Sequence, residues 1–220
     1  MITLPRVVSA GAAPIQAQYQ VFFMKKLWLN IIPGKDLVAD QIFYYHQELP
    51  KYIRGYHKCT KQDAIKLAAV ILRVRYNAQS QQALMSITND LKEIVPFDLI
   101  KAQSQSEWKK NISSAYSADG RMTVEEAKNK FLQIIYQWPT YGSTFFEVKQ
   151  SSEPTFPEVV IIAINKNGVN VIHPQTKVKL CSNYKIILKN VLCLNVTLLQ
   201  FMVQIIKIIS MYRNQKSIIF

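Results

Sequence analysis

The sequence has few of the residues that form covalent cross-links or carry out catalysis. Its 220 residues include three cysteines, an odd number with no Cys-x-x-Cys spacing, which argues against a disulfide framework and a zinc site. No phosphate-binding loop, His-Glu-x-x-His helix or Gly-x-Ser-x-Gly elbow is present. His46, His57 and His173 fall on different predicted elements, so we expect structural roles for them. We therefore predict an intracellular protein that is not an enzyme and has no metal or cofactor.

Acidic residues are also scarce, and they are unevenly distributed. Lysine and arginine total 27 against 14 acidic residues, which gives a formal charge of +13. Residues 178–220 contain six basic residues and no acidic residue, so residues 1–177 carry 21 basic and 14 acidic groups, or +7. An excess of this sign favours anionic partners such as nucleic acid, a membrane surface or an acidic protein segment.

The N-terminal part has no continuous apolar core of signal-peptide length. We expect residues 1–18 to be a flexible lead-in. Residues 19–32 (YQVFFMKKLWLNII) are rich in aromatic and β-branched residues and end at Pro33 and Gly34, which predicts a strand followed by a turn. Fewer than twenty residues precede this strand, so its sheet is very small or mostly missing from the chain.

Residues 36–140 have helical patterns. Asp36 is placed to cap a first helix that Pro50 ends, and Thr60 caps a second whose apolar face is Ile65, Ala69, Leu72 and Tyr76. Thr123 and Glu126 form a capping box before a third helix that stops at Pro139. The apolar stripe of this third helix is Ala127, Phe131, Ile134, Ile135 and Trp138. Residues 98–116 predict one or two shorter helices, so the block has four or five helices.

After Pro139 the spacing of apolar residues changes from the helical repeat to the alternation of a strand. Residues 143–150 and 158–165 predict two strands, and residues 166–174 predict a third. Asn165 to Gly168 form a hairpin turn, because Asn and Gly tolerate the positive φ angles that such turns need. The predicted structure is an antiparallel meander that starts at residue 141 and loses its pattern after Lys177.

Residues 178–220 form an atypical apolar and basic tail without glycine or proline. This composition is that of translated A/T-rich non-coding sequence, which predicts a retained intron or a faulty gene model. Residues 191–211 are long enough to span a membrane as a helix. Polar residues, Lys207 among them, make insertion costly, so an amphipathic helix or misfolding is favoured over an anchor.

A basic run with interleaved tyrosines lies between the first two predicted helices, in residues 49–61 (LPKYIRGYHKCTK). Such a run could form an anion or nucleic-acid patch. A solvated connection whose tyrosines pack inward explains it as well, and no nucleic-acid motif accompanies it. We favour the solvated connection and expect no nucleic-acid partner.

Four stretches together resemble one family. They are residues 19–28 (YQVFFMKKLW), 48–60 (ELPKYIRGYHKCT), 125–150 (EEAKNKFLQIIYQWPTYGSTFFEVKQ) and 153–177 (EPTFPEVVIIAINKNGVNVIHPQTK). They resemble the C-terminal FERM domain of class VII unconventional myosin tails over residues 19–177. A FERM domain has a ubiquitin-like first lobe, a helical second lobe similar to acyl-CoA-binding protein, and a third lobe with a pleckstrin-homology-like sheet.

The resemblance implies an α+β fold with incomplete outer lobes. Residues 19–35 match the last strand of the first lobe, which is mostly missing, residues 36–140 match the helical second lobe, and residues 141–177 match the start of the third. It implies a non-enzymatic, cytoplasmic and cytoskeleton-associated module that links an actin-based motor to cargo or adaptor proteins, with the motor domain absent from this chain. The aromatic joint between the second and third lobes supplies four candidate partner-binding residues, although core packing also explains them: Trp138, Tyr141, Phe145 and Phe146.

The family also offers an alternative function at the membrane surface. Other FERM domains bind anionic phospholipids, and five basic residues of this chain are candidates for that role: Lys25, Lys26, Arg54, Lys58 and Lys61. Salt distinguishes the two functions, because binding to acidic vesicles weakens steeply with ionic strength and groove-bound peptides are less sensitive.

Overall fold

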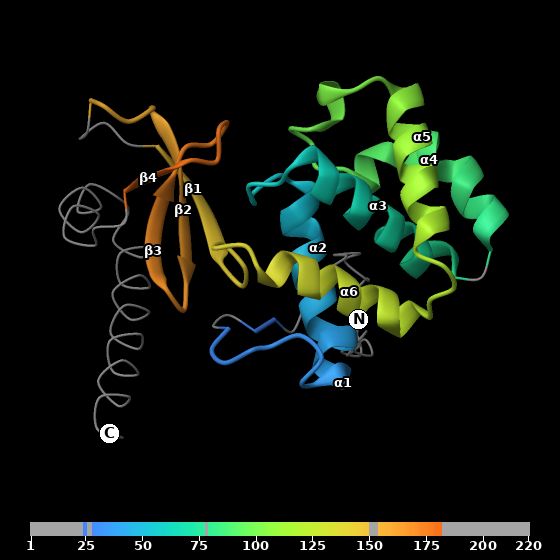
Figure 1. Ribbon diagram of the computed structural model, residues 1–220. Coiled ribbons are helices and arrows are strands. Elements are labelled where there is room, and N and C mark those ends of the chain that lie inside the picture. The colour runs from blue at the N-terminus through green and yellow to red at the C-terminus, as the bar shows by residue number, and fades with distance from the viewer. Residues whose placement is uncertain (1–23, 26–27, 78, 150–153, 182–220) are drawn as a thin grey trace, which may run out of the picture.

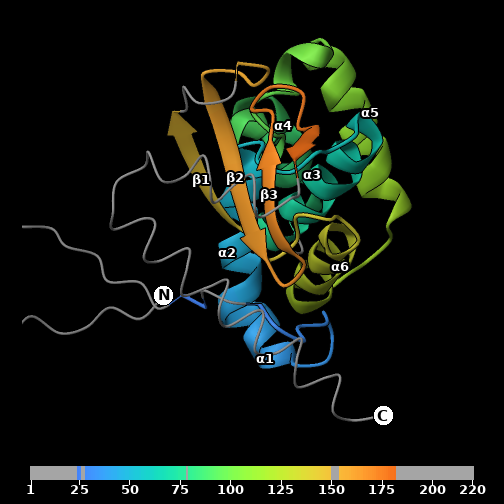
Figure 2. The same cartoon turned by 90° about the vertical axis from the view of Figure 1, so that its left-hand side faces the viewer.

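The fold consists of a block of helices with a small antiparallel sheet beside it, joined by one short connection (Figures 1 and 2). The computed structural model describes residues 24–25, 28–77, 79–149 and 154–181. No helix in this described part is both long and apolar enough to cross a membrane. The helix-then-sheet order agrees with the predicted α+β class.

The helical block, called here the helical lobe, extends from residue 37 to residue 136. Its elements are α1 (Leu37–Ala39), the π-helix η1 (Asp40–Tyr44), α2 (Tyr45–Ile53), α3 (Lys61–Tyr76), α4 (Ser80–Ile94), the 3-10 helix η2 (Ile100–Ala102), α5 (Gln105–Ala118) and α6 (Val124–Tyr136). Three predicted caps are confirmed, since the side chains of Asp36, Thr60 and Thr123 each accept a backbone N–H of the following turn.

The segment before α1 is not the predicted strand over its described part. Residues 24, 25 and 28–32 have no strand structure, and residues 19–23 lie outside the described residues. Trp28 and Ile31 are instead buried in the core of the helical lobe. Two of the residues that predicted a strand, Trp28 and Ile31, therefore pack on helices instead.

The prediction that Pro50 ends the first helix was wrong. Helical structure continues through α1, η1 and α2 to Ile53, with Pro50 inside α2. Tyr52, just beyond Pro50, is fully buried and donates its hydroxyl to the carbonyl of Ile94 at 3.2 Å. This tertiary contact offsets the loss of the backbone hydrogen bond that a proline removes from a helix.

Helix α3 is central, whereas the sequence predicted a single buried face. It packs against α4, α5 and α6, and every residue from Leu67 to Arg73 is buried. Arg73 places its guanidinium over the ring of Tyr116, and its Nη2 donates to the Tyr116 carbonyl at 2.5 Å. A cation on the core side of α3 is contacted in this way by an aromatic ring and a carbonyl oxygen.

The sheet has the order β1-β2-β3-β4 and is antiparallel throughout. Its strands are β1 (Thr144–Lys149), β2 (Val159–Asn165), β3 (Gly168–Ile172) and β4 (Lys179–Cys181). The predicted first three strands and the Asn165–Gly168 turn are confirmed, with Asn165 paired to Gly168. Ile161, Ala163 and Ile172 form a small core that packs against Tyr56 of the helical lobe and Phe145 of β1.

The sheet continues beyond Lys177, where the predicted pattern ended. Residues Lys179–Cys181 form β4, which pairs with β3 around an irregularity between Val171 and Ile172. The start of the predicted atypical tail therefore belongs to the sheet. The rest of that tail, and with it the predicted span at 191–211, lies outside the described residues.

We predict that Phe131→Ala lowers the free energy of unfolding by about 3 to 5 kcal/mol, as expected for a large buried aromatic side chain. Phe131 is fully buried, and its ring lies edge-on to Tyr45 and Tyr52 at 5.0 and 5.8 Å. Urea denaturation followed by circular dichroism measures the change. Met85→Ala is the control, because Met85 is 70% exposed and its loss should cost no more than about 0.5 kcal/mol.

Candidate functional site

The connection between the helical lobe and the sheet is tightly folded. We call residues 138–143, between the end of α6 and the start of β1, the joint. The amide of Tyr141 donates to the carbonyl of Trp138 at 3.0 Å, and the amide of Ser143 donates to that of Thr140 at 3.1 Å. Gly142 has a φ of 65°, in the left-handed region that favours glycine. Two successive turns thus redirect the chain from a helix into a strand.

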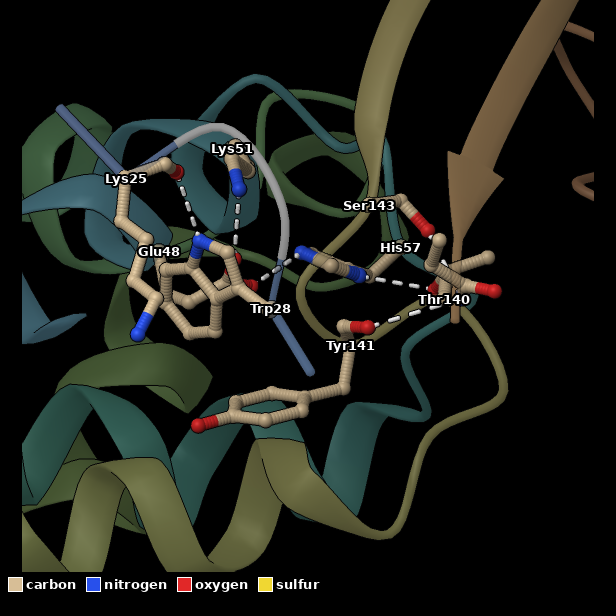
Figure 3. A network of polar contacts seen from close by, with 9 residues as sticks. Lys25, Trp28, Glu48, Lys51, His57, Thr140, Tyr141 and Ser143 are labelled. Atoms are coloured by element: carbon tan, nitrogen blue, oxygen red, sulfur yellow. Dashed lines mark hydrogen bonds and ion pairs between the residues drawn. The ribbon is translucent and has the colours of Figure 1, made fainter. Parts of the chain in front are cut away.

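A buried polar chain connects the joint to α2 (Figure 3). The Nδ1 atom of His57 lies 2.8 Å from Thr140 Oγ1, and its Nε2 atom lies 3.1 Å from Glu48 Oε2. The side chains of His57 and Glu48 are both fully buried. The imidazole therefore bridges the helical lobe and the joint, which is a structural role of the kind predicted for His57.

The charge on Glu48 is held by its neighbours. Lys51 donates from Nζ to Glu48 Oε1 at 2.6 Å. Burial raises the pKa of the Glu48 carboxyl, but the contacts with His57 and Lys51 together outweigh burial and leave the net pKa below its ordinary value. A carboxylate at this depth is stable only with such partners.

Trp28 covers the outside of the joint. Its ring lies 5.2 Å from that of Tyr141, edge-on, and 5.0 Å from Lys51 Nζ. Its indole Nε1 donates to the carbonyl of Lys25 at 2.9 Å. A Cβ added to Gly142 would lie 2.8 Å from the Trp28 Cβ, so the two residues are in close contact. The segment before α1 therefore packs directly on the joint.

The β2–β3 hairpin holds the joint from the sheet side. Asn165 is 2% exposed, and its Nδ2 donates to the Pro139 carbonyl at 2.8 Å and to Ser143 Oγ at 3.0 Å. Lys166, the next residue, places its Nζ 5.5 Å from the ring centre of Tyr136 at the end of α6. The hairpin turn predicted from Asn165 and Gly168 thus also fastens the sheet to the helical lobe.

A second interaction between lobe and sheet is electrostatic and acts between the charges of Asp98, after α4, and Lys177, before β4. Burial raises the pKa of Asp98, and the charge of Lys177 opposes that effect. Burial likewise lowers the pKa of Lys177, and the negative charge of Asp98 opposes that effect. A Cβ on Gly55 would lie 2.6 Å from Asp98 Oδ1, so the residue after α2 leaves room for this carboxylate.

The predicted partner-binding residues lie at the joint and on β1. Trp138 packs near Tyr52 and His57, Tyr141 is 7% exposed, and Phe145 stacks on Tyr56 at 5.0 Å. Phe146 is half-buried on β1. Packing accounts for the first three, and a partner-binding role for all four stays a prediction.

The structure separates the predicted anion-binding residues. Lys25 contacts the Tyr44 hydroxyl at the start of α2, whereas Arg54 is the C-terminal cap of that helix. The nine residues of α2, about 14 Å of helix, lie between Tyr44 and Arg54. Arg54 and Lys58 are exposed in the connection between α2 and α3, Lys61 is exposed at the first position of α3, and Lys26 lies outside the described residues. Their role in anion binding stays a prediction.

Several residues that build the joint could not be found from the sequence. Glu48, Trp28 and Asn165 were not predicted as site residues, because their partners are distant in the chain. Within the described residues no group of three or more His, Cys, Asp and Glu side chains could hold a metal ion. What the geometry offers is a rigid connection that fixes the sheet on the helical lobe.

We predict that Gly142→Ala destabilises the protein more than Gly120→Ala does. Both glycines have a φ of 65°, so each substitution incurs about 1 to 2 kcal/mol of left-handed backbone strain. Only Gly142 faces a neighbour, and the clash with Trp28 adds about 1 to 3 kcal/mol of overpacking, whereas nothing lies within 4 Å of a Cβ on Gly120. Denaturant midpoints measure both variants, and equal losses would contradict a close-packed joint.

We predict that Glu48→Gln costs about 3 to 5 kcal/mol at neutral pH, because it leaves buried cationic or polar partners without their carboxylate. The folded-state pKa of Glu48 lies below its ordinary value of 4.5. The stabilisation is therefore complete above pH 4.5 and is lost as the pH falls through the folded-state pKa. The difference between wild type and variant should shrink over that range.

Chemical denaturation at a series of pH values measures this difference. Glu158→Gln is the control, since Glu158 is 77% exposed and 3.7 Å from Lys149. A Glu48→Gln curve parallel to that of wild type at all pH values would show that the charge of Glu48 does not stabilise the joint.

The sequence matches a known family over the helical lobe and the joint. Residues 38–146 match the FERM central domain. The chain is 58% identical over 172 residues to Myosin-VIIa of Drosophila melanogaster, and 52% identical over 165 residues to unconventional myosin-VIIb of Mus musculus. These matches cover 78% and 75% of the chain and 8% of each relative, so the chain spans a small part of those proteins.

Solved structures agree with the sequence comparison. The human Myosin 7b C-terminal MyTH4-FERM domain, solved in complex with the harmonin-a PDZ3 domain, is 55% identical with a TM-score of 0.71, and the match covers 75% of this chain and 34% of that one. A Dictyostelium discoideum Myosin VII MyTH4-FERM domain, MF2, has the same fold at 26% identity, a TM-score of 0.52, and coverage of 63% and 27%. FERM domains of this kind are protein-interaction modules in a family not known for enzymatic activity. The chain therefore belongs to the FERM family, among the C-terminal FERM domains of class VII unconventional myosin tails.

Proposed function

We propose that this chain is a protein-interaction module of a myosin tail that links an actin-based motor to cargo or adaptor proteins. The observation that carries the proposal is the 55% identity to the human Myosin 7b domain, which was solved bound to the harmonin-a PDZ3 domain. A cytoplasmic location in association with the cytoskeleton follows from this proposal, since the similar relatives are myosins.

The joint supports the proposal by fixing the surfaces that a partner would meet. Buried side chains from α2, the joint and β2 hold the sheet in one orientation on the helical lobe. A fixed orientation reduces the conformational entropy that binding must remove. We expect a partner to contact both the helical lobe and the sheet.

A second candidate function is binding to anionic phospholipids. Arg54 and Lys58 are exposed in the connection between α2 and α3, and Lys61 is exposed at the first position of α3, which favours a compact basic surface. Lys61 lies near the exposed Glu107 carboxylate, which weakens that surface. We therefore rank lipid binding below protein binding.

We predict that the chain binds the harmonin-a PDZ3 domain with a saturable isotherm in isothermal titration calorimetry. Phe146→Ala should weaken this binding about tenfold or more if the predicted residue lies at the interface, since large aromatic side chains dominate interface energies. Met85→Ala, an exposed residue on α4, is the matched control and should bind like wild type.

Circular dichroism on each sample confirms that the helical lobe is folded. A folded chain without measurable heat on adding PDZ3 would contradict this choice of partner. Binding to acidic vesicles that disappears as the salt concentration rises, together with no PDZ3 binding, would instead favour the phospholipid function.

A further inference from the structure

The most exposed large apolar side chain in the described part of the chain is that of Phe97, in the loop between α4 and η2. This side chain is 77% exposed. Its backbone is nevertheless fixed, because the Phe97 amide donates to the carbonyl of Ile53 at 2.9 Å and Pro96 before it is buried. An aromatic ring that is exposed on a fixed backbone can serve as an anchor for a binding partner.

The sheet brings a second exposed apolar residue to the same region. Val178, between β3 and β4, is 49% exposed. The charge of Lys177, the residue before Val178, acts on Asp98, the residue after Phe97. The loop between β3 and β4 also extends from the sheet toward the helical lobe (Figure 1). Phe97 and Val178 therefore flank the electrostatic interaction between the lobe and the sheet.

Basic side chains from both lobes lie in this region. Arg54 and Lys58 are exposed in the connection between α2 and α3. Lys179 of β4 is also exposed, and it pairs with Ile172 of β3. Cross-strand partners share a face of a sheet, and Ile172 packs against Tyr56 of that connection. Lys179 therefore belongs to the face of the sheet that packs on the connection.

The region carries positive charge beside its apolar groups. We call Arg54, Lys58, Phe97, Val178 and Lys179 the seam surface. Its three basic residues form no ion pair within the residues that the structure describes. Two carboxylates of the region, those of Asp98 and Glu147, both act on Lys177. The seam surface thus complements a segment that combines acidic and apolar residues.

The position of Asp98 favours a protein segment over a membrane as the occupant. Asp98 is exposed next to Phe97, so its negative charge would face anionic headgroups if Phe97 entered a bilayer. A protein segment meets the surface residue by residue, and its acidic side chains can pair with the three basic residues while avoiding Asp98.

We propose that the seam surface binds a segment of a partner protein in which acidic residues flank a large apolar residue. The apolar residue packs on Phe97 and Val178, and the acidic residues pair with the three basic side chains. This inference rests on the proposed function as a protein-interaction module, and it adds the surface and the chemistry of the partner. Because the seam surface includes both lobes, binding depends on the orientation that the joint fixes.

A library of short random peptides, displayed on phage and selected on the full chain, supplies the probe. We expect the selected sequences to be enriched in Asp and Glu around a large apolar residue. Fluorescence polarisation of a selected peptide then measures its affinity for each variant. Phe97→Ala should weaken binding about tenfold or more, because aromatic anchors dominate interface energies. Met85→Ala removes a similarly exposed side chain from α4 and should bind within about twofold of wild type.

The same assay tests the contribution of charge. Arg54→Gln/Lys179→Gln should weaken binding about tenfold and make the remaining affinity less sensitive to salt. Lys35→Gln/Arg121→Gln is the matched control, because it removes the same charge from exposed positions before α1 and before α6. Circular dichroism confirms that each variant is folded.

Several outcomes would overturn the proposal. One is selected peptides without acidic enrichment, and another is a peptide that binds Phe97→Ala as tightly as wild type. Binding to vesicles of anionic phospholipid, or self-association in light scattering, that depends on Phe97 while no peptide binds would also overturn it.

Titration with the harmonin-a PDZ3 domain, the partner in the solved Myosin 7b complex, separates this inference from the proposed function. PDZ3 binding by a chain that selects no peptide at the seam surface would contradict only the inference. Peptide binding at the seam surface without PDZ3 binding would contradict only that choice of partner.

Discussion

The buried contact of His57 with Glu48 and Thr140 is the constraint on which the arrangement of helices and sheet depends. One imidazole touches a carboxylate of α2 and a hydroxyl of the joint, and both of its ring nitrogens are used. Glu48 has no access to solvent. Its carboxylate therefore remains charged only because His57 and Lys51 contact it. The polar chain therefore fixes the position of the joint as well as stabilising it.

Aromatic packing surrounds this polar chain and makes the joint continuous with the core. Trp28 contacts Tyr44, Tyr141 and Lys51, so the segment before α1, the start of α2 and the joint meet at one indole. On the other side, Asn165 joins the β2–β3 hairpin to the same turns. The parts of the chain that meet here are separated by more than a hundred residues, so the joint determines how the two lobes are oriented.

The sequence predicted elements whose causes are local. The Thr123 capping box and the Asn165–Gly168 turn depend on neighbouring residues, and both are confirmed. Pro50 and the described part of the predicted strand, residues 24–25 and 28–32, were misjudged, because burial of Tyr52 and Trp28 on distant helices outweighed the local preference. The contact of His57 with Thr140 spans 83 residues, and no pattern in a single sequence reveals such a pair.

The contacts at the joint make the helical lobe and the sheet one cooperative unit. Native-state hydrogen exchange at increasing denaturant tests this directly, with the amides of α3 and β2 as reporters. The account predicts that the slowest amides of both elements open with the same free energy and the same dependence on denaturant. If the β2 amides opened at a much lower free energy than those of α3, the sheet would unfold independently and the central role of the joint would be contradicted.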